Sequence, residues 1–353
     1  MSTISIKPPQ LPAWLKPALA QWMAQVGGRE IGGKQIGGEN ASLAQSIGIS
    51  DPHATGGHYA AIALAHSLLC LKPNTDGAAC GQCSACALLK AGNHTDLMTL
   101  LPESMQADFT PEKDKKPSKT IKIDQVRAIE AQLFKSAQHG GRKVVLIYPA
   151  QALGDVPANA ILKTLEEPPA GVYMILVSQH WEQVLATLRS RCIVTALSAP
   201  SAEQKTAWLA AQGVEHSARW LELAAGKVDR ASEMATDPQW MPLLKLMPYL
   251  VSGAQIDALG LAADMSRYEL KRVIEGLQLW MHDLLALSMH APAVFFAKQA
   301  QGMANMLHSL DQAKAFDFVV QLNTLGRMAE HPLNARAQVE AVLLEYQSMF
   351  KAR

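Results

Sequence analysis

Residues 141–198 carry the pattern that most restricts the fold of this chain. Val144–Ile147 is an unbroken apolar run of mostly β-branched residues, as expected of a strand that is buried on both faces. Tyr173–Val177 is a second such run, and the segment between them predicts a helix that starts at Asp155 and stops before the proline pair at 168. A strand, a helix and a strand of these lengths predict a parallel α/β sheet, in which ligands bind at the carboxyl ends of the strands.

Length and composition limit the class of protein. The chain has 353 residues, enough for two or three domains, and 49% of it is apolar. The net charge of +1 gives no overall attraction to nucleic acid, so any DNA contact needs a local basic patch. No apolar run approaches the roughly 18 residues of a membrane span, and the N-terminal residues lack the layout of a signal peptide. We therefore expect a cytoplasmic protein with no membrane partner and with reduced thiols.

Four of the five cysteines lie close together in the sequence. They are Cys70, Cys80, Cys83 and Cys86, with the spacing C-x9-C-x2-C-x2-C. Thiolates at two-residue gaps can converge on one tetrahedral ion, and in a reducing compartment Zn²⁺ explains them better than disulfides do. Buried structural cysteines are the alternative, which the polar residues between Cys80 and Cys86 disfavour. Four thiolates close the coordination shell, so we expect structural zinc worth on the order of 10 kcal/mol to local folding and no catalytic position.

The first strand of the sheet is predicted at residues 43–49. The segment after it occupies the place of a phosphate-binding loop. That loop has the motif G-x-x-x-x-G-K-S/T. Aligned on Gly57, this chain has Pro52 at the first glycine, His58 at the lysine and Tyr59 at the hydroxyl position. Both a degenerate P-loop and an ordinary strand-to-helix loop predict no tight ATP binding. The sequence leaves open a residual anion site at the N-terminus of the following helix.

Several other segments carry weaker signals. Residues 27–38 contain three Gly-Gly pairs and predict a flexible loop in preference to a phosphate cradle, because no strand leads into them. Residues 113–122 are lysine-rich but partly offset by acidic residues, which favours a solvated loop over a DNA-phosphate patch. Residues 121–133 predict a strand that runs into a helix capped by Asp124, and residues 181–188 predict a further helix.

The C-terminal part of the chain is predicted to be helical, without visible chemistry. Residues 201–236 predict a small helical domain, in which a surface role for Arg230 is preferred to a nucleotide-sensing role. Apolar stripes at helical spacing follow over residues 270–285 and 339–346, which predicts buried helix faces. The histidines in this part are scattered, so a metal site is not expected there.

Three phrases of the sequence resemble those of the bacterial clamp-loader subunits, a family of AAA+ proteins. They are LKTLEEPP at 162–169, RSRC at 189–192 and IKIDQVR at 121–127, and the four-cysteine insertion follows the same helix as in that family. The resemblance implies an α/β AAA+ core with a zinc insertion, a small helical lid domain and an all-α C-terminal collar domain. The boundaries that it implies are residues 1–197 for the core, with the zinc module at 70–86, residues 198–240 for the lid and residues 241–353 for the collar.

The resemblance also bears on catalysis. In the ATP-hydrolysing members of the family, an Asp-Glu pair ends the strand before the LEEPP helix and holds magnesium. Tyr148 and Pro149 occupy those places here, and neither offers a carboxylate that could bind a metal or accept a proton. The resemblance therefore implies a chain with no bound ATP and no ATPase activity of its own.

Arg191 is the catalytic candidate that the resemblance singles out. In clamp loaders the arginine of the Ser-Arg-Cys phrase lies at the subunit boundary and reaches the γ-phosphate of ATP on the neighbouring subunit. A guanidinium is always charged and binds phosphate oxygens through two parallel hydrogen bonds, which suits this role. The alternative for Arg191 is a salt bridge within its own domain. Arg189 is expected to be a supporting or surface residue, and Cys192 a packing residue.

The function that follows is that of a non-catalytic clamp-loader subunit of the replicative DNA polymerase III holoenzyme. Its implied partners are the gamma/tau ATPase subunits and the delta subunit, the sliding clamp indirectly or weakly, and primed DNA through the assembled complex. An active gamma/tau-type ATPase is the first alternative, and it requires the lysine and the acidic pair. A zinc-ribbon DNA-binding protein is the second, and it requires a basic face around the cysteines.

Overall fold

The computed structural model describes residues 11–26, 29–31, 34–36, 45–106, 117–328 and 334–351. The chain divides into two compact units, Met1–Gln204 and Lys205–Arg353, which are described separately. No helix in the described ranges is long and apolar enough to cross a membrane. The predicted three-domain division with boundaries at 197 and 240 stays a prediction.

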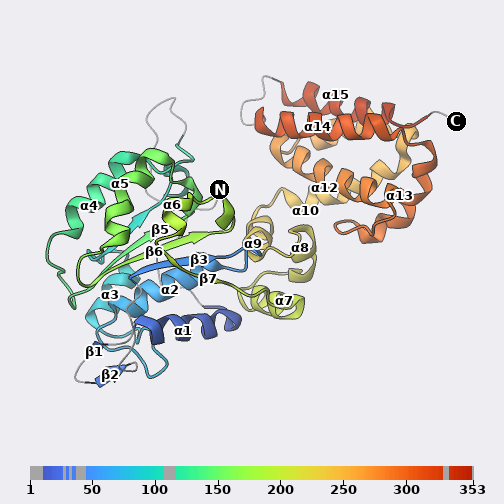
Figure 1. Ribbon diagram of the computed structural model, residues 1–353. Helices are drawn as coiled ribbons and strands as arrows, with labels where there is room; N and C mark the ends of the chain where they lie inside the picture. Colours follow the sequence, from blue (N-terminus) through green and yellow to red (C-terminus); the bar gives the residue numbers. More distant parts are fainter. Residues whose placement is uncertain are drawn as a thin grey trace. The chain divides into compact units, whose positions relative to one another are not determined.

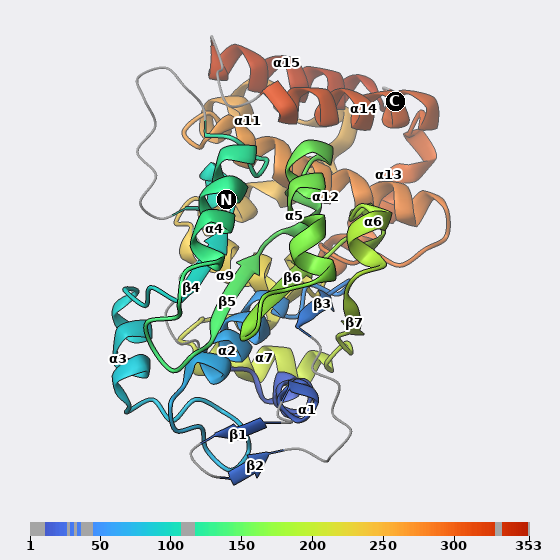
Figure 2. The same ribbon diagram turned by 60° about the vertical axis from the view of Figure 1, so that its left-hand side comes forward.

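The first unit contains a five-stranded parallel sheet. Its strands are β3 (Ser46–Ser50), β4 (Leu97–Leu100), β5 (Lys143–Ile147), β6 (Val172–Ser178) and β7 (Ile193–Ala196), in the spatial order β4-β5-β6-β3-β7 (Figure 2). Every residue of β5 and β6 is buried, which confirms the two strands predicted from the apolar runs. The predicted first strand begins at Ser46, and residues 43 and 44 lie outside the described part of the chain.

Helices cover both faces of this sheet (Figure 1). The helices of the unit are α1 (Lys16–Val26), α2 (Gly57–Leu69), α3 (Ser84–Ala91), α4 (Ile123–Leu133), α5 (Asp155–Glu166) and α6 (Ala186–Arg189). Alternate strand residues face opposite cores: Val144 packs in a cluster with α1 and α2, whereas Val145 packs in a cluster with α4 and α5. The sheet is therefore a buried middle layer, and its carboxyl-end loops remain at the surface, where a site can form.

Three local predictions in this unit were wrong. Residue 121 forms only an isolated parallel bridge to Leu153, and α4 is capped at Lys122, so that Asp124 lies in the first helical turn. The predicted helix over 181–188 is a 3-10 turn (Trp181–Gln183) followed by the short α6, because the intervening Val184 is extended and buried in the core.

The glycine-rich segment is also more regular than predicted. Within it, β1 (Arg29–Ile31) and β2 (Lys34–Ile36) pair antiparallel, whereas a flexible loop was expected. Backbone hydrogen bonds between the two strands account for the difference, since they need no apolar side-chain pattern. The remaining glycines of residues 27–38 lie outside the described residues.

The second unit is helical throughout its described residues. Its helices are α7 (Ala202–Ala211, which begins in the first unit), α8 (Ser217–Leu223), α9 (Val228–Thr236), α10 (Trp240–Leu246), α11 (Ala258–Met265), α12 (Leu270–Ser288), α13 (Ala300–Met306), α14 (Gln312–Met328) and α15 (Ala335–Ser348), with a 3-10 segment at Met247–Gln255. The predicted stripes on α12 and α15 are buried, and Trp280 donates a hydrogen bond to the Tyr346 hydroxyl at 3.0 Å. The buried faces of α12 and α15 thus belong to the apolar interior of this unit.

Candidate functional site

The four predicted cysteines converge at the junction of α2 and α3. Cys70 ends α2, Cys83 is the N-cap of α3, and Cys86 lies in the first turn of α3. The Sγ–Sγ distances are 3.8 Å for Cys70–Cys83, 3.6 Å for Cys70–Cys86 and 3.9 Å for Cys80–Cys86. All four sulfur atoms lie within 4.8 Å of one another. The sequence prediction that these residues form one group is thus confirmed.

This spacing fits a tetrahedral metal centre. Four thiolates at about 2.3 Å from a central ion are about 3.8 Å from one another, close to the three distances observed. A disulfide needs sulfur atoms about 2.0 Å apart, and all four cysteines are free. Four sulfur ligands complete a tetrahedral shell, so that such a centre has no position for substrate.

Backbone N–H groups surround the sulfur atoms. The amides of Gln82 and Cys83 donate to Cys80 Sγ at 3.5 and 3.4 Å, and these hydrogen bonds lower the pKa of Cys80. Burial raises the pKa of Cys83, but hydrogen bonds from backbone amides, including that of Cys86, outweigh it and lower the pKa to about 6. Burial raises the pKa of Cys70. Two of the four thiols are therefore biased toward the thiolate form that a metal requires.

The carboxyl end of β5 lacks the acidic pair of an ATPase. Tyr148 is buried and Pro149 follows it, as the sequence indicates. The neighbouring strand end carries Ser178, whose hydroxyl donates to Gln151 Oε1 at 2.6 Å. Neither strand end presents a carboxylate for magnesium.

The loop after β3 does contain a carboxylate, which sequence analysis missed. Asp51 is only 1% exposed, and its oxygens accept hydrogen bonds from Thr55 and Gly57 at the start of α2. This carboxylate engages the amides of Thr55 and Gly57, and the residual anion site that the sequence left open stays a prediction. A signal was present in the sequence, since Asp51-Pro52 is a turn-forming pair placed before two glycines.

His58, at the position of the P-loop lysine, does not supply a positive charge. Burial lowers its pKa to about 4, and the charge of Asp51 opposes that shift only in part. The imidazole ring lies 5.6 Å from the Tyr148 ring in a stacked arrangement. At neutral pH the ring is therefore uncharged and packs as an aromatic group.

Arg191 lies between α6 and β7 and is partly buried. Its guanidinium forms an ion pair with Glu166 at the end of α5, and Nη1 donates to the Thr187 carbonyl at 2.8 Å. The salt bridge within its own unit, which the sequence left as an alternative, is thus present. Arg189, expected to be a supporting or surface residue, is exposed.

Other charged candidates are engaged in local ion pairs. Arg230 pairs with Glu275 at 3.2 Å within the second unit, which agrees with the surface role preferred from the sequence. In the basic segment, Lys122 pairs with Glu103, while residues 113–116 lie outside the described residues.

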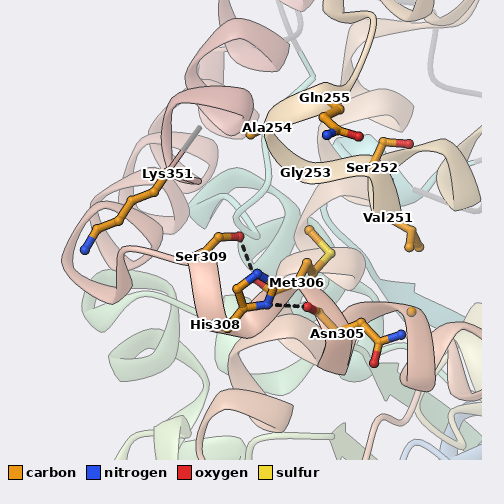
Figure 3. A pocket seen from close by; sticks show the side chains of 11 residues that line it. Val251, Ser252, Gly253, Ala254, Gln255, Asn305, Met306, His308, Ser309 and Lys351 are labelled. Atoms are coloured by element: carbon orange, nitrogen blue, oxygen red, sulfur yellow. Dashed lines mark hydrogen bonds between the residues drawn. The ribbon is translucent and has the colours of Figure 1, made fainter. Parts of the chain in front are cut away.

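The second unit contains a cavity of about 340 Å³ between the 3-10 segment and α13 (Figure 3). His308, Ser309, Asn305 and Lys351 contribute polar groups to its lining. His308 Nδ1 lies 2.6 Å from the Asn305 carbonyl oxygen, and the Ser309 hydroxyl donates to the Met306 carbonyl at 2.9 Å. These groups satisfy the end of a helix, and none of the predicted site residues lies here.

The first unit is thus an α/β core with a parallel sheet, helices on both of its faces and a quartet of close cysteines. Comparisons with known proteins show which family the chain resembles. Residues 37–201 match the family described as "DNA polymerase III, delta subunit". The chain is 38% identical over 203 residues to the delta-prime subunit of DNA polymerase III from Pseudomonas aeruginosa, covering 58% of this chain and 54% of that protein.

A second relative is the delta-prime subunit from Escherichia coli K12, which is 41% identical over 147 residues, covering 42% of this chain and 40% of that protein. The resemblance of this chain to the delta-prime subunits of bacterial DNA polymerase III is thereby confirmed. The chain spans about half the length of the curated relatives it matches. A solved structure of a DNA polymerase III gamma-subunit-related protein from Thermotoga maritima has 17% identity and a TM-score of 0.41, covering 87% of this chain and 95% of that one. A similarity of that size carries no functional argument.

Proposed function

We propose that this protein is a non-catalytic clamp-loader subunit of the delta-prime type, which completes the ATPase site of a neighbouring subunit. The observation that carries this proposal is the state of the nucleotide loop in a chain related to delta-prime subunits. A neutral His58, Tyr148 and Pro149 stand where an ATPase has a lysine and two carboxylates. Nothing in this loop can neutralise a triphosphate or position magnesium.

In this proposal Arg191 supplies an arginine finger in trans. Its guanidinium is held by the carboxylate of Glu166, whose side chain is 49% exposed, and by one backbone carbonyl. An exposed ion pair is weak, on the order of 0–1 kcal/mol, so that a phosphate of a neighbouring nucleotide can displace Glu166. In GTPases such a finger accelerates phosphoryl transfer by roughly 10³ to 10⁵.

The cysteine quartet has a structural role in this proposal, with Zn²⁺ as its ion. Zinc suits four sulfur ligands in a tetrahedron, and Cys70, Cys80, Cys83 and Cys86 would hold it. The ion would tie the end of α2 to the start of α3, and it would take no part in catalysis. The proposed location is the cytoplasm, where replication takes place.

The helical second unit is proposed to comprise a lid and an oligomerising collar. Partners in this proposal are the gamma/tau ATPase subunits and the delta subunit, with the sliding clamp and primed DNA reached through the assembled complex. An active gamma/tau-type ATPase and a zinc-ribbon DNA-binding protein remain the competing functions, and no observation of the site favours either.

ATP hydrolysis distinguishes these functions. The chain alone is expected to show no turnover, and addition of ATPase and delta subunits, clamp and primed DNA is expected to give turnover that depends on Arg191. Arg191→Ala should reduce that rate by at least tenfold, because no other cation replaces the guanidinium. Arg191→Lys should recover little, since an ammonium cannot form two parallel hydrogen bonds with phosphate.

The control is Arg189→Ala, which removes an exposed arginine two residues away and should leave the rate unchanged. Equal rates for the wild type and Arg191→Ala complexes would refute the finger role. Turnover by the isolated chain would instead support the ATPase alternative, and tight binding of DNA by the isolated chain would support the zinc-ribbon alternative.

A further inference from the structure

Arg191 is held by two partners of different chemistry. Its Nη2 atom forms an ion pair with the Glu166 carboxylate at the end of α5, and its Nη1 atom donates to the Thr187 carbonyl of α6 at 2.8 Å. The Ser190 hydroxyl, which donates to the same carbonyl at 3.2 Å, lies 3.4 Å from Nη1. One partner is therefore charged and belongs to another helix, whereas the other is a neutral group of the helix just before Arg191.

Glu166 lies at the unfavourable end of its helix. It is the last residue of α5, and Glu167 follows it as the C-cap. The C-terminus of a helix carries partial negative charge, so that a carboxylate there is disfavoured and a cation beside it is favoured. Arg191 supplies such a cation, in addition to Lys163 in the last turn of the helix. Glu166 therefore loses a favourable partner whenever the guanidinium turns away from it.

The ion pair is accessible to a docking partner. The Arg191 side chain is 28% exposed, and that of Glu166 is 49% exposed. Arg191 Nε is buried and has no hydrogen-bond partner among the described residues, so the contacts within the unit leave this guanidinium incompletely satisfied. Phosphate binds a guanidinium through two parallel N–H···O bonds, and Glu166 already occupies one of the outer nitrogen atoms. Carboxylate and phosphate therefore compete for Nη2.

We propose that Glu166 is a positioning residue, a latch that holds Arg191 against its own unit until the γ-phosphate of a nucleotide on a neighbouring subunit binds the guanidinium. This inference rests on the finger role proposed above and adds its regulation. The latch weakens assembly, because Nη2 must leave Glu166 before it can bind phosphate, and the carboxylate then remains unpaired at the end of α5. An exposed ion pair accounts for a weakening of up to about fivefold.

The test compares binding of the full chain to the gamma/tau ATPase and delta subunits, loaded either with a non-hydrolysable ATP analogue or with ADP. Glu166→Gln removes the charge at almost unchanged shape. It should strengthen binding about two- to fivefold with the ATP analogue and leave binding unchanged with ADP, which lacks the γ-phosphate. A merely structural role of Glu166 would change both affinities equally. ATP turnover by the saturated complex should stay the same, because Arg191 reaches the same bound state.

Glu167→Gln is the matched control. It removes the same charge one residue further on, from an exposed side chain that has no ion pair with Arg191 in the described part of the chain. This variant should bind as the wild type does with either nucleotide. Arg191→Ala should weaken binding with the ATP analogue, and Glu166→Gln should have no further effect in that background, since the latch then has nothing to hold.

Three results would overturn the latch while Arg191→Ala still weakens binding: equal affinities of the wild type and Glu166→Gln with the ATP analogue, an equal gain with ADP, or an equal gain from Glu167→Gln. A gain from Glu166→Gln that persists after Arg191→Ala would also overturn it, since Glu166 would then repel the triphosphate directly. If Arg191→Ala changes neither binding nor turnover, the finger role fails, and the latch fails with it.

Discussion

Backbone N–H groups donate to side chains at the starts of two helices in the first unit. They donate to the carboxylate of Asp51 in the loop before α2, and they lower the pKa of Cys83 to about 6 at the start of α3. A charge that is bound by several amides loses little by burial, because the amides replace the hydration that it gives up.

The cysteine quartet gives a prediction for single residues. Cys83→Ser should reduce the zinc content of the purified protein from about one equivalent to a small fraction, because serine does not replace a thiolate ligand. Cys192→Ser is the matched control: this thiol packs against the core beneath α5, and burial raises its pKa to about 12. The zinc content of both variants, measured by mass spectrometry, tests this prediction. Full zinc content in the Cys83 variant, or equal loss in both variants, would contradict the four-cysteine assignment.

At the scale of elements, the connections of the sheet depend on particular backbone conformations. The turn from α5 to β6 passes through Gly171, whose φ is 79°. A Cβ atom there would lie 2.5 Å from the Gly141 carbonyl oxygen, at the start of β5. The close approach of these two backbones thus leaves no room for a side chain at residue 171.

This close approach predicts the effect of two matched glycine substitutions. Gly171→Ala should lower the free energy of unfolding by about 2 kcal/mol or more, since it combines a left-handed backbone with a clash against a rigid carbonyl. Gly154→Ala, at the start of α5, should have little effect, because nothing lies within 4 Å of the added carbon. Denaturant unfolding of the two variants tests this, and a similar loss in both would show that the close approach is not what matters.

At the scale of the whole molecule, both units bury carboxylates that accept backbone N–H groups, as Asp51 does in the first unit. In the second unit Asp283 on α12 is 0% exposed. It accepts the N–H groups of Val294, Phe295 and Phe296 at 2.9, 2.7 and 2.6 Å. The Asp283 carboxylate therefore holds the segment after α12 in place, and Phe296 of that segment contacts Trp280.

Removal of the Asp283 carboxylate should make the second unit less stable. Asp283→Ala is expected to lower its free energy of unfolding by about 3 kcal/mol or more, because three backbone N–H groups lose a charged acceptor. The control Asp264→Ala removes an exposed carboxylate that pairs with Arg267 at 3.2 Å, and its cost should stay below about 1 kcal/mol. Chemical denaturation followed by tryptophan fluorescence measures both. Equal losses of unfolding free energy in the two variants would show that the buried hydrogen bonds of Asp283 contribute no more than an exposed ion pair.

The zinc content of the Asp283→Ala variant can be measured as well. All bonds of Asp283 lie within the second unit, whereas the cysteines belong to the first. Asp283→Ala should therefore retain its metal under conditions in which the variant is folded.

The sequence by itself determined the parallel sheet, the cysteine cluster and the absence of the ATPase residues. These features are local: the apolar runs of β5 and β6 bury both faces of a strand, two-residue gaps bring cysteines together, and a missing lysine is missing in any fold. Its errors were local too: α4 begins after a capping box at Lys122 and Gln125, and the extended Val184 ends the 3-10 turn before α6.

Only the tertiary structure decided what each polar group binds. Asp51 reaches the Gly57 amide of α2 through a turn, and Arg191 meets Glu166 of α5 from the connection between α6 and β7. Neither pairing follows from a pattern of residues, because hydrogen bonds and ion pairs depend on distances that exist only after the sheet and its helices have packed. The missing ATPase residues were therefore readable in the sequence, whereas the partners of the Asp51 carboxylate and of Arg191 were not.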